Sequence, residues 1–177
     1  MLFLASCADD IEKLKEEYIT VKIEVRDYGT MTLKLYPDIA PITVEHFVTL
    51  ADEGFYDGLI FHRIISNFMI QGGDPTGTGY GDPDQDTIKG EFSYNNVENP
   101  LSHKRGVISM ARSNSYNSAT SQFFICRNDS PHLDGQYAAF GELVEGFDVL
   151  DAIADVETGA SDRPLTEVVI ERIYTVE

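Results

Sequence analysis

Apolar and polar residues alternate through the first part of the chain, after a short polar segment. Residues 18–26 (YITVKIEVR) and 30–36 (TMTLKLY) alternate with a period of two, and the tripeptide DYG between them is typical of a turn. This pattern predicts a β-hairpin with one buried face. Pro41 is a favourable first residue for a helix, and apolar positions then recur at helical spacing. We therefore expect a helix over residues 42–53 that ends at Gly54.

Short apolar runs separated by turn residues fill most of the remaining chain. They are LIFHRII, FMIQ, GVISMA, QFFICR and AAFGELV. A second short helix fits residues 146–156, and a strand over residues 167–176 closes the chain. Many short strands with few helices predict a mainly β fold, a closed antiparallel barrel rather than a doubly wound sheet. Residues 9–17 suggest a short surface helix, so we divide the chain into an N-terminal tail (1–17) and one domain (18–177).

The composition is that of an ordinary globular protein. Of 177 residues, 42% are hydrophobic and 24% are charged, which suits one domain with one core and excludes a disordered chain, a collagen and a multi-span membrane protein. The 13 basic and 30 acidic residues give a formal net charge of −17. Such a field repels phosphate groups, which argues against nucleic acid as a direct partner and against an anionic membrane surface.

Motifs for metals, cofactors and nucleophiles are missing from the sequence. The two cysteines form no CxxC pair and the four histidines have no metal-ligand spacing, so we expect no zinc site, one free terminal thiol (Cys7) and one buried thiol (Cys126). The acidic loop within residues 74–96 resembles the start of a calcium loop but lacks the required glycine and glutamate, which favours a solvated loop. Neither GxSxG nor a phosphate loop is present, so no cofactor is expected.

The first residues leave two locations open. Residues 4–7 (LASC) resemble a lipoprotein box, in which the cysteine is lipidated after cleavage. The apolar run before Cys7 is shorter than an export signal needs, and no basic residue precedes it. The sequence as written therefore predicts a cytoplasmic protein. The alternative is an exported, membrane-tethered lipoprotein anchored through Cys7, if the true start lies upstream.

An arginine inside an apolar run is the clearest chemical signal. Arg63 lies in LIFHRII, and strand alternation would place it on the same face as Phe61 and Ile65. An unpaired buried charge is costly, so Arg63 requires partners. The residues alone leave open whether it forms a structural ion pair or belongs to a functional site. For the neighbouring His62 we expect a structural role as a hydrogen-bonding residue.

Several longer motifs resemble one protein family. The stretches FHRIISNFMIQGGDPTGTGYG, GVISMARS, SQFFICRND and LDGQYAAFGELVEGFDVLDAI resemble, in order and spacing, the cyclophilin family of peptidyl-prolyl cis–trans isomerases. The resemblance covers residues 19 to about 176. It implies a closed eight-stranded antiparallel barrel capped by two α-helices. It also implies rotation about X-Pro peptide bonds as the reaction, with no metal or cofactor.

The resemblance also assigns the site residues. It implies that Arg63 is the catalytic arginine, and that an apolar proline pocket is formed by Phe68, Met69, Phe124 and Leu133. Because side chains alternate along a strand, only one of Phe123 and Phe124 can face the groove. The remaining positions implied to contact substrate are polar groups at the groove (Gln71, Gln122), a backbone segment that pairs with the peptide (Ala111, Arg112), a rim position (His132) and a pocket position (Tyr137).

Two of these positions depart from the family's pattern. His132 stands where the family frequently has a tryptophan, and Tyr137 where many members have a histidine. An indole offers a larger apolar face than an imidazole, so we expect weak binding of cyclosporin, a drug that members of this family bind.

The chemistry implied for this site needs only positioned donors. Rotation about an X-Pro bond faces a barrier of about 18–20 kcal/mol because amide resonance is lost. A fixed guanidinium that bonds the twisted state more strongly than the planar state lowers that barrier. We therefore expect a monomeric isomerase that acts on proline-containing peptides and folding proteins. The alternative is a proline-segment binding module or chaperone with little catalysis.

Overall fold

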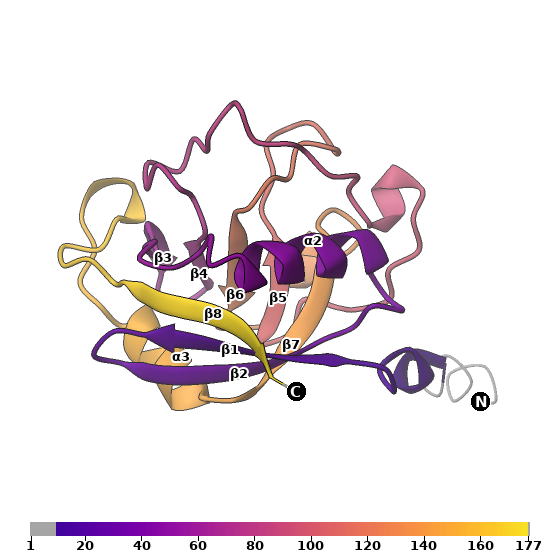
Figure 1. Cartoon of the computed structure of the whole chain (residues 1–177), viewed down its shortest axis with the longest axis horizontal. Helices are drawn as coiled ribbons and strands as arrows, with labels where there is room; N and C mark the ends of the chain where they lie inside the picture. The colour runs from indigo at the N-terminus through magenta and orange to yellow at the C-terminus, as the bar shows by residue number, and fades with distance from the viewer. Residues whose placement is uncertain (1–9, 177) are drawn as a thin grey trace.

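Eight strands form a single antiparallel sheet in the computed structural model, which describes residues 10–176 (Figure 1). The strand order across the sheet is β3-β4-β6-β5-β7-β2-β1-β8. In chain order the strands are β1 (Ile19–Val25), β2 (Gly29–Leu35), β3 (Arg63–Ile65), β4 (Met69–Gly72), β5 (Val107–Met110), β6 (Phe123–Cys126), β7 (Ala139–Glu145) and β8 (Ile170–Val176). The lipoprotein-like residues 4–7 lie outside the described part of the chain.

The two edge strands, β3 and β8, meet only briefly. One isolated antiparallel bridge joins Ile60 to Val169, just before β3 and just before β8. Beside it, the amide of Phe61 donates to the carbonyl of Val168 at 2.9 Å. The predicted mainly β, eight-stranded antiparallel fold is therefore confirmed. The sheet is a curled barrel that is closed by a short bridge rather than by a full strand pair.

The predicted hairpin is β1 and β2. Val21 pairs with Leu33 and Ile23 pairs with Met31, and all four side chains are fully buried. The polar residues between them stay partly accessible, as the alternation predicted.

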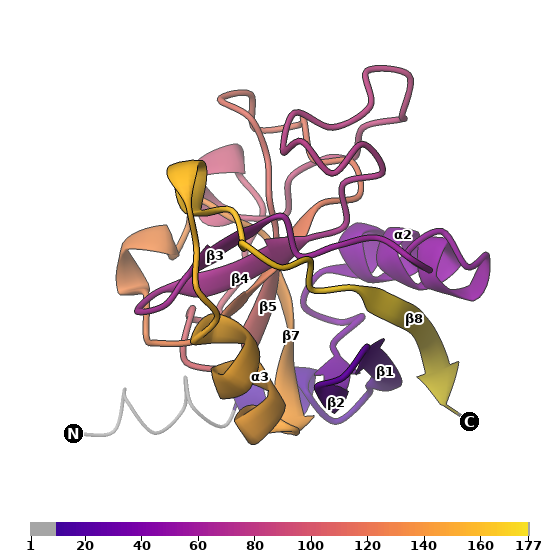
Figure 2. The ribbon, with the colours of Figure 1, turned by 90° about the vertical axis from the view of Figure 1, so that its left-hand side faces the viewer.

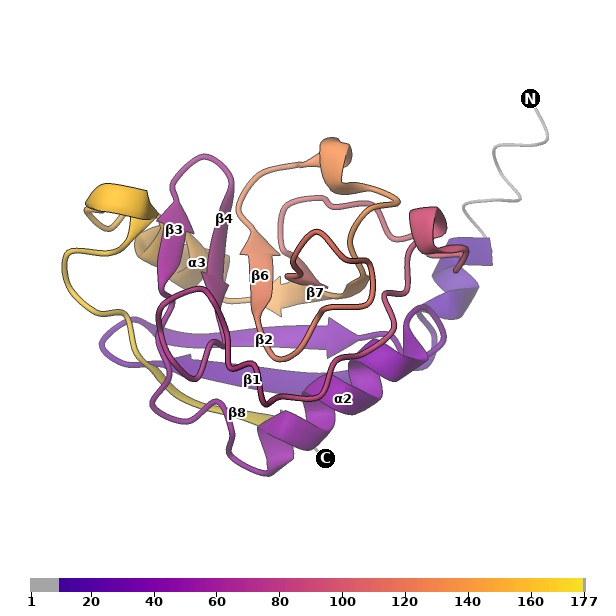
Figure 3. The same cartoon turned by 90° about the horizontal axis from the view of Figure 1, so that it is seen from above.

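Two α-helices lie at opposite sides of the barrel (Figures 2 and 3). They are α2 (Pro41–Asp52) and α3 (Phe147–Ala154), and both lie within a few residues of their predicted ranges. Residues 10–14 are also helical, and Leu14 packs against the main core. No helix in the described residues is both long enough and apolar enough to cross a membrane.

A carboxylate from the long central loop caps α2. Glu91 is almost fully buried and accepts hydrogen bonds from the amides of Ile42 (3.1 Å) and Thr43 (2.8 Å). A negative charge at a helix N-terminus satisfies unpaired amides and interacts favourably with the helix dipole. The cap fixes the loop that follows β4 against the body of the barrel.

Candidate active site

The strands β3, β4 and β6 present two different apolar faces. Their inward side chains, which include Ile64, Ile70, Phe123 and Ile125, belong to the main core of the barrel. Their outward side chains join a second, smaller cluster, which we call the outer cluster; it comprises Met69, Phe124, Cys126 and Leu133, with Ile65, Phe68, Ala111 and Tyr137 packed against it. Phe124 is thus the groove-side phenylalanine of the FF pair, and Phe123 is a core residue.

Strand register brings the polar part of the site next to this cluster. Arg63 pairs with Gln71 across β3 and β4, and Gln71 pairs with Phe124 across β4 and β6. Directly paired residues of an antiparallel sheet point to the same face. The three side chains therefore stand in a row on the outer face, although 61 positions separate Arg63 from Phe124 along the chain.

A cavity of about 170 Å³ opens over this row. Its walls come from several elements that are distant in sequence. The resemblance assigned every lining residue to the site. The lining residues are Arg63, Phe68, Met69, Gln71, Ala111, Arg112, Phe124, Leu133 and Tyr137.

The other two assigned residues, Gln122 and His132, lie beside the cavity. The side-chain amide of Gln71 donates to that of Gln122 at 3.0 Å, and Gln122 donates in turn to the carbonyl of Gly79 at 3.3 Å. The ring of His132 lies against Phe68, with 5.5 Å between the ring centroids. Gln122 therefore anchors Gln71 to the loop after β4, and His132 extends the apolar wall outward.

Arg63 stands at the polar edge of the cavity with its side chain 43% exposed. Its Nη1 donates to Gln71 Oε1 at 3.5 Å, and its Nε lies 3.5 Å from Asp162 Oδ2. Within residues 10–176, Nη2 donates no hydrogen bond. One edge of the guanidinium thus keeps donors for a ligand.

Two sequence-based expectations next to Arg63 are wrong. Phe61 belongs to the main core and packs against Phe123, because β3 begins only at Arg63 and the alternation does not extend back to Phe61. His62 is buried, and neither ring nitrogen has a hydrogen-bond partner among the described residues. Burial lowers the pKa of His62, which keeps the imidazole neutral near pH 7.

A polar pair, the buried His103 and the half-buried Asp134, supports the aromatic wall from behind. The ring of His103 stacks on Phe124, with 6.0 Å between centroids and 16° between planes. His103 Nδ1 lies 2.9 Å from Asp134 and Nε2 lies 3.0 Å from the hydroxyl of Ser109. Burial lowers the pKa of His103 more than Asp134 raises it, so the ring is neutral, donates to Asp134 and accepts from Ser109. This pair fixes the plane against which Phe124 rests.

The side chain of Arg112 is used within the protein. Its guanidinium donates to the carbonyl of Gln136 at 2.9 and 2.8 Å and to that of Ser113 at 2.9 Å, and it lies 4.6 Å from the centre of the Tyr137 ring. The backbone N–H and C=O of Arg112 take part in no hydrogen bond within the described chain. The segment therefore keeps one backbone donor and one backbone acceptor for a ligand.

The donors expected of a metal site do not come together. Nowhere in residues 10–176 do three or more His, Cys, Asp or Glu side chains lie close enough to hold an ion. The thiol of Cys126 is fully enclosed in the outer cluster, and burial raises its pKa to about 12. What the site offers is one guanidinium, two amides, one backbone segment and an apolar cavity.

A family model described as cyclophilin-type peptidyl-prolyl cis-trans isomerase/CLD matches residues 20–175. The chain belongs to this cyclophilin family. Solved structures agree: the chain superposes on a crystal structure of a cyclophilin-type isomerase from Cryptosporidium parvum with a TM-score of 0.82 and 32% identity, covering 91% of this chain and 99% of that one. A second structure of that protein, determined in the presence of the dipeptide Ala-Pro, gives 0.81 and 33%, covering 89% of this chain and 99% of that one.

Curated relatives show the same family at higher identity. A peptidyl-prolyl cis-trans isomerase of Arabidopsis thaliana is 43% identical over 146 residues, with 82% of this chain and 89% of that protein covered. A peptidyl-prolyl cis-trans isomerase-like protein of Neurospora crassa is 46% identical over 149 residues, with 84% and 89% covered. The chain spans only 40% and 25% of the length of two other relatives, from Streptococcus pyogenes and Gibberella zeae.

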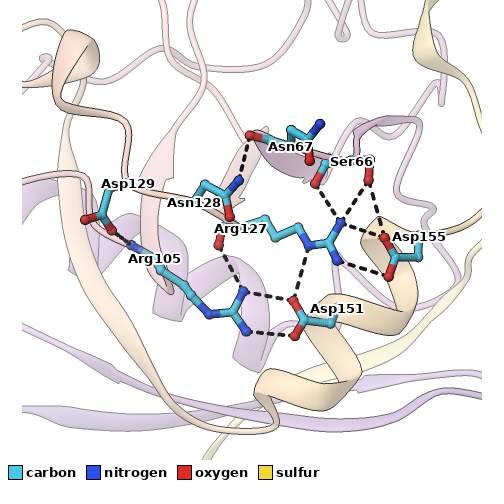
Figure 4. A network of polar contacts seen from close by, with 8 residues as sticks. All are labelled: Ser66, Asn67, Arg105, Arg127, Asn128, Asp129, Asp151 and Asp155. Atoms are coloured by element: carbon cyan, nitrogen blue, oxygen red, sulfur yellow. Dashed lines mark hydrogen bonds and ion pairs between the residues drawn. The ribbon is translucent and has the colours of Figure 1, made fainter.

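In this cyclophilin the turn that carries Phe68 into the site is fastened by a polar network (Figure 4). The carbonyl of Phe68 accepts from the amide of Arg127 at 2.8 Å. The guanidinium of Arg127 donates to both the carbonyl and the hydroxyl of Ser66 at 2.8 Å, and Asn128 donates to the carbonyl of Asn67 at 3.1 Å. All three residues of the β3–β4 turn are thus bonded to the end of β6.

Helix α3 and the residue directly after it supply the carboxylates of the same network. Asp155 contacts Arg127 at 2.6 and 3.0 Å, and Asp151 lies 3.2 Å from Arg127 Nε. Asp151 also receives two hydrogen bonds of 2.8 Å from Arg105. Paired guanidinium and carboxylate groups lower the pKa of Asp151 and raise those of both arginines. The helix at one side of the barrel therefore braces the turn that holds a pocket wall.

Three contributors to the site have no role that the sequence assigned to them: Asp162, His103 and Arg127. Asp162 and Arg127 look like surface charges in an acidic chain, since each contact depends on a distant segment. The available signal for His103 was weak, namely a histidine without metal-ligand spacing just before an apolar strand.

Proposed function

We propose that this cyclophilin catalyses cis–trans rotation about X-Pro peptide bonds. The observation that carries the proposal is the cavity of about 170 Å³ with apolar walls on one side and the guanidinium of Arg63 on the other. The apolar walls suit a proline ring, and the unused backbone groups of Arg112 suit the extended chain around it. The Ala-Pro dipeptide used with the Cryptosporidium parvum relative supports a ligand of this class.

In the proposed reaction, Arg63 donates through Nη2, which has no hydrogen-bond partner among the described residues, to the prolyl nitrogen or the adjacent carbonyl as amide conjugation is lost. The prolyl nitrogen becomes more basic in the twisted state. The hydrogen bond from Arg63 is therefore stronger in the transition state than in the planar ground state, which lowers the barrier. The apolar walls hold the ring while the preceding carbonyl swings. A rate increase of about 10⁵ requires roughly 7 kcal/mol of differential stabilisation, which charge-assisted bonds together with anchoring can supply.

The decisive test is the exchange rate of a short X-Pro peptide, measured by NMR, with the wild type and Arg63→Ala. We expect the exchange rate to fall roughly 10²–10³-fold in the variant, the usual effect of removing one donor to a developing charge. The circular dichroism spectrum should be unchanged. Arg63→Lys should recover little, because lysine lacks the planar fork. Peptide binding by the wild type without any acceleration would favour the alternative, a proline-segment binding module.

The finer expectations belong to the same proposal. We infer action on folding proteins, weak cyclosporin binding and a monomeric state. Supporting the second point, the rim position holds His132 against Phe68 instead of an indole. Refolding of a client limited by X-Pro isomerisation, calorimetric titration with the drug and sedimentation would test the three in turn.

The location stays a sequence-based proposal. The cytoplasm is favoured, with the lipid-anchored alternative resting on the resemblance of residues 4–7 to a lipoprotein box. The mass of the native protein, with or without a lipid on Cys7, decides between them.

A further inference from the structure

A second hollow lies next to the active-site cavity. Its volume is about 650 Å³, and Arg63 and Gln71 line both spaces. The part of its wall that contacts Arg63 is the short 3₁₀ turn η3 (Ala160–Asp162), which lies in the connection between α3 and β8. The catalytic arginine therefore stands between the substrate cavity and a turn that is about 100 residues away in sequence.

The backbone of this turn is unusual. Ser161 (φ 58°) and Asp162 (φ 59°) are consecutive non-glycine residues in the left-handed region. That region is unfavourable for residues with a Cβ atom, and such strain persists only where the surroundings enforce it. Here an isolated bridge between Thr158 and Pro164 closes the turn, and Arg163 donates to the carbonyl of Gly77 at 2.6 Å.

The strained conformation has one visible result. It places the carboxylate of Asp162 3.5 Å from Nε of Arg63. Gln71 holds the Nη1 side of the same guanidinium at 3.5 Å and is itself fixed by Gln122. Within the described chain, Asp162 is the one carboxylate in ion-pair contact with Arg63. Nε and Nη1 thus each have a partner, and Nη2, which donates no hydrogen bond within the described chain, is left for the substrate.

We propose that Asp162 is a positioning residue for the isomerase reaction, which orients the guanidinium of Arg63 toward the proline cavity. This inference rests on the proposed function. A carboxylate also neutralises part of the charge that stabilises the twisted amide, so the two effects oppose each other. The side chains of Arg63 and Asp162 are 43% and 46% exposed, and water screens the neutralisation. A long arginine side chain otherwise has considerable rotamer freedom, so orientation outweighs neutralisation.

The test compares three variants by NMR exchange of an uncharged X-Pro peptide. Asp162→Asn keeps a residue type that tolerates the left-handed region and removes only the charge. We expect kcat/KM to fall about two- to fivefold, the range of a half-exposed ion pair. Asp162→Gly should show the same fall together with a higher Tm, because glycine relieves the strain. The matched control Ser161→Gly should raise Tm and leave the rate unchanged.

Two further readouts separate positioning from a structural role. Added salt weakens the ion pair, so the wild-type rate should fall toward that of Asp162→Asn, while the variant's rate stays constant. In an Arg63→Ala background, Asp162→Asn should change nothing, because the group it orients is gone.

The proposal is overturned if Asp162→Asn equals or exceeds the wild type, or if Ser161→Gly reduces the rate as much as Asp162→Asn does. It is also overturned if the Asp162→Asn effect persists without Arg63. Failure of the proposed function looks different, because the wild type would then show no acceleration of the peptide at all.

Discussion

The adjacent residues Phe123 and Phe124 can be compared directly. The same substitution should affect mainly stability at one position and mainly function at the other. Phe123 is fully buried among Phe47, Tyr56 and Phe61, with ring centroids 5.4, 5.6 and 6.1 Å away. Phe124 is 5% exposed and lines the cavity beside Arg63. We expect Phe123→Leu to reduce mainly stability, and Phe124→Leu to reduce mainly peptide binding and rate.

The magnitudes follow from the surroundings. Burying a ring of proline's size stabilises a complex by about 1.5–3 kcal/mol. Phe124 is one of six hydrophobic side chains around the cavity and the one backed by His103, so we assign it roughly a third to a half of that energy. Its truncation to alanine should weaken peptide binding by about 0.5–1.5 kcal/mol, or about two- to twelvefold. Phe123→Ala should destabilise the fold by about 3–5 kcal/mol.

The assay combines calorimetric titration with a proline peptide, NMR exchange rates and urea unfolding on the same preparations. The leucine variants serve where an alanine variant fails to fold. The reasoning is refuted if Phe124→Leu binds the peptide normally and loses only stability. It is equally refuted if folded Phe123→Leu weakens binding more than Phe124→Leu does.

Three further predictions concern the surroundings of the cavity. Arg127→Met should lower stability by about 1–2 kcal/mol and raise KM, because the turn that carries Phe68 loses its anchor. Arg105→Met leaves that turn untouched and should lower stability with KM unchanged. Equal KM values for the two variants would contradict the role of the network. Because burial lowers the pKa of His103 in the folded state, the unfolded state takes up the proton first, so stability should fall as pH drops below about 6.5. His103→Gln should reduce that loss between about pH 7.5 and about pH 5 in urea unfolding, and an unchanged slope would refute the assignment. His132→Trp should tighten cyclosporin by roughly 1–2 kcal/mol in a calorimetric titration with isomerase activity kept, and no gain would show that the rim does not control affinity.

Local patterns were sufficient for the elements whose partners are close in sequence. The β1–β2 hairpin has a strict two-residue period, and α2 begins at a proline and ends before a glycine, so both were predictable to within a few residues. Phe61 shows where such patterns stop. The apolar run continues through it, but the strand begins at Arg63, and the bridge to β8 that redirects Phe61 into the core depends on a segment over 100 residues away.

The site itself was predictable only through the family resemblance. Its walls come from β3, β4, β6, the segment after β5 and the 3₁₀ turn η2 (Pro131–Leu133), and no periodicity within one element indicates that they meet. Alternation alone showed that one of Phe123 and Phe124 faces outward, but which one depends on strand register. Likewise, nothing in the sequence shows that His62 is buried without hydrogen-bond partners.

Arg63 illustrates how a sound principle was applied to the wrong environment. Its place in an apolar run predicts a buried charge, which requires a partner and leaves open a structural ion pair or a functional role. The side chain is in fact 43% exposed, so burial does not demand the contact with Asp162. Exposed ion pairs contribute little to stability, and this one is made by a turn with two unfavourable left-handed residues. A contact that costs backbone strain and adds little stability is better explained by the orientation that it gives the Arg63 guanidinium. The ion pair and the proposed functional role are then two aspects of one arrangement.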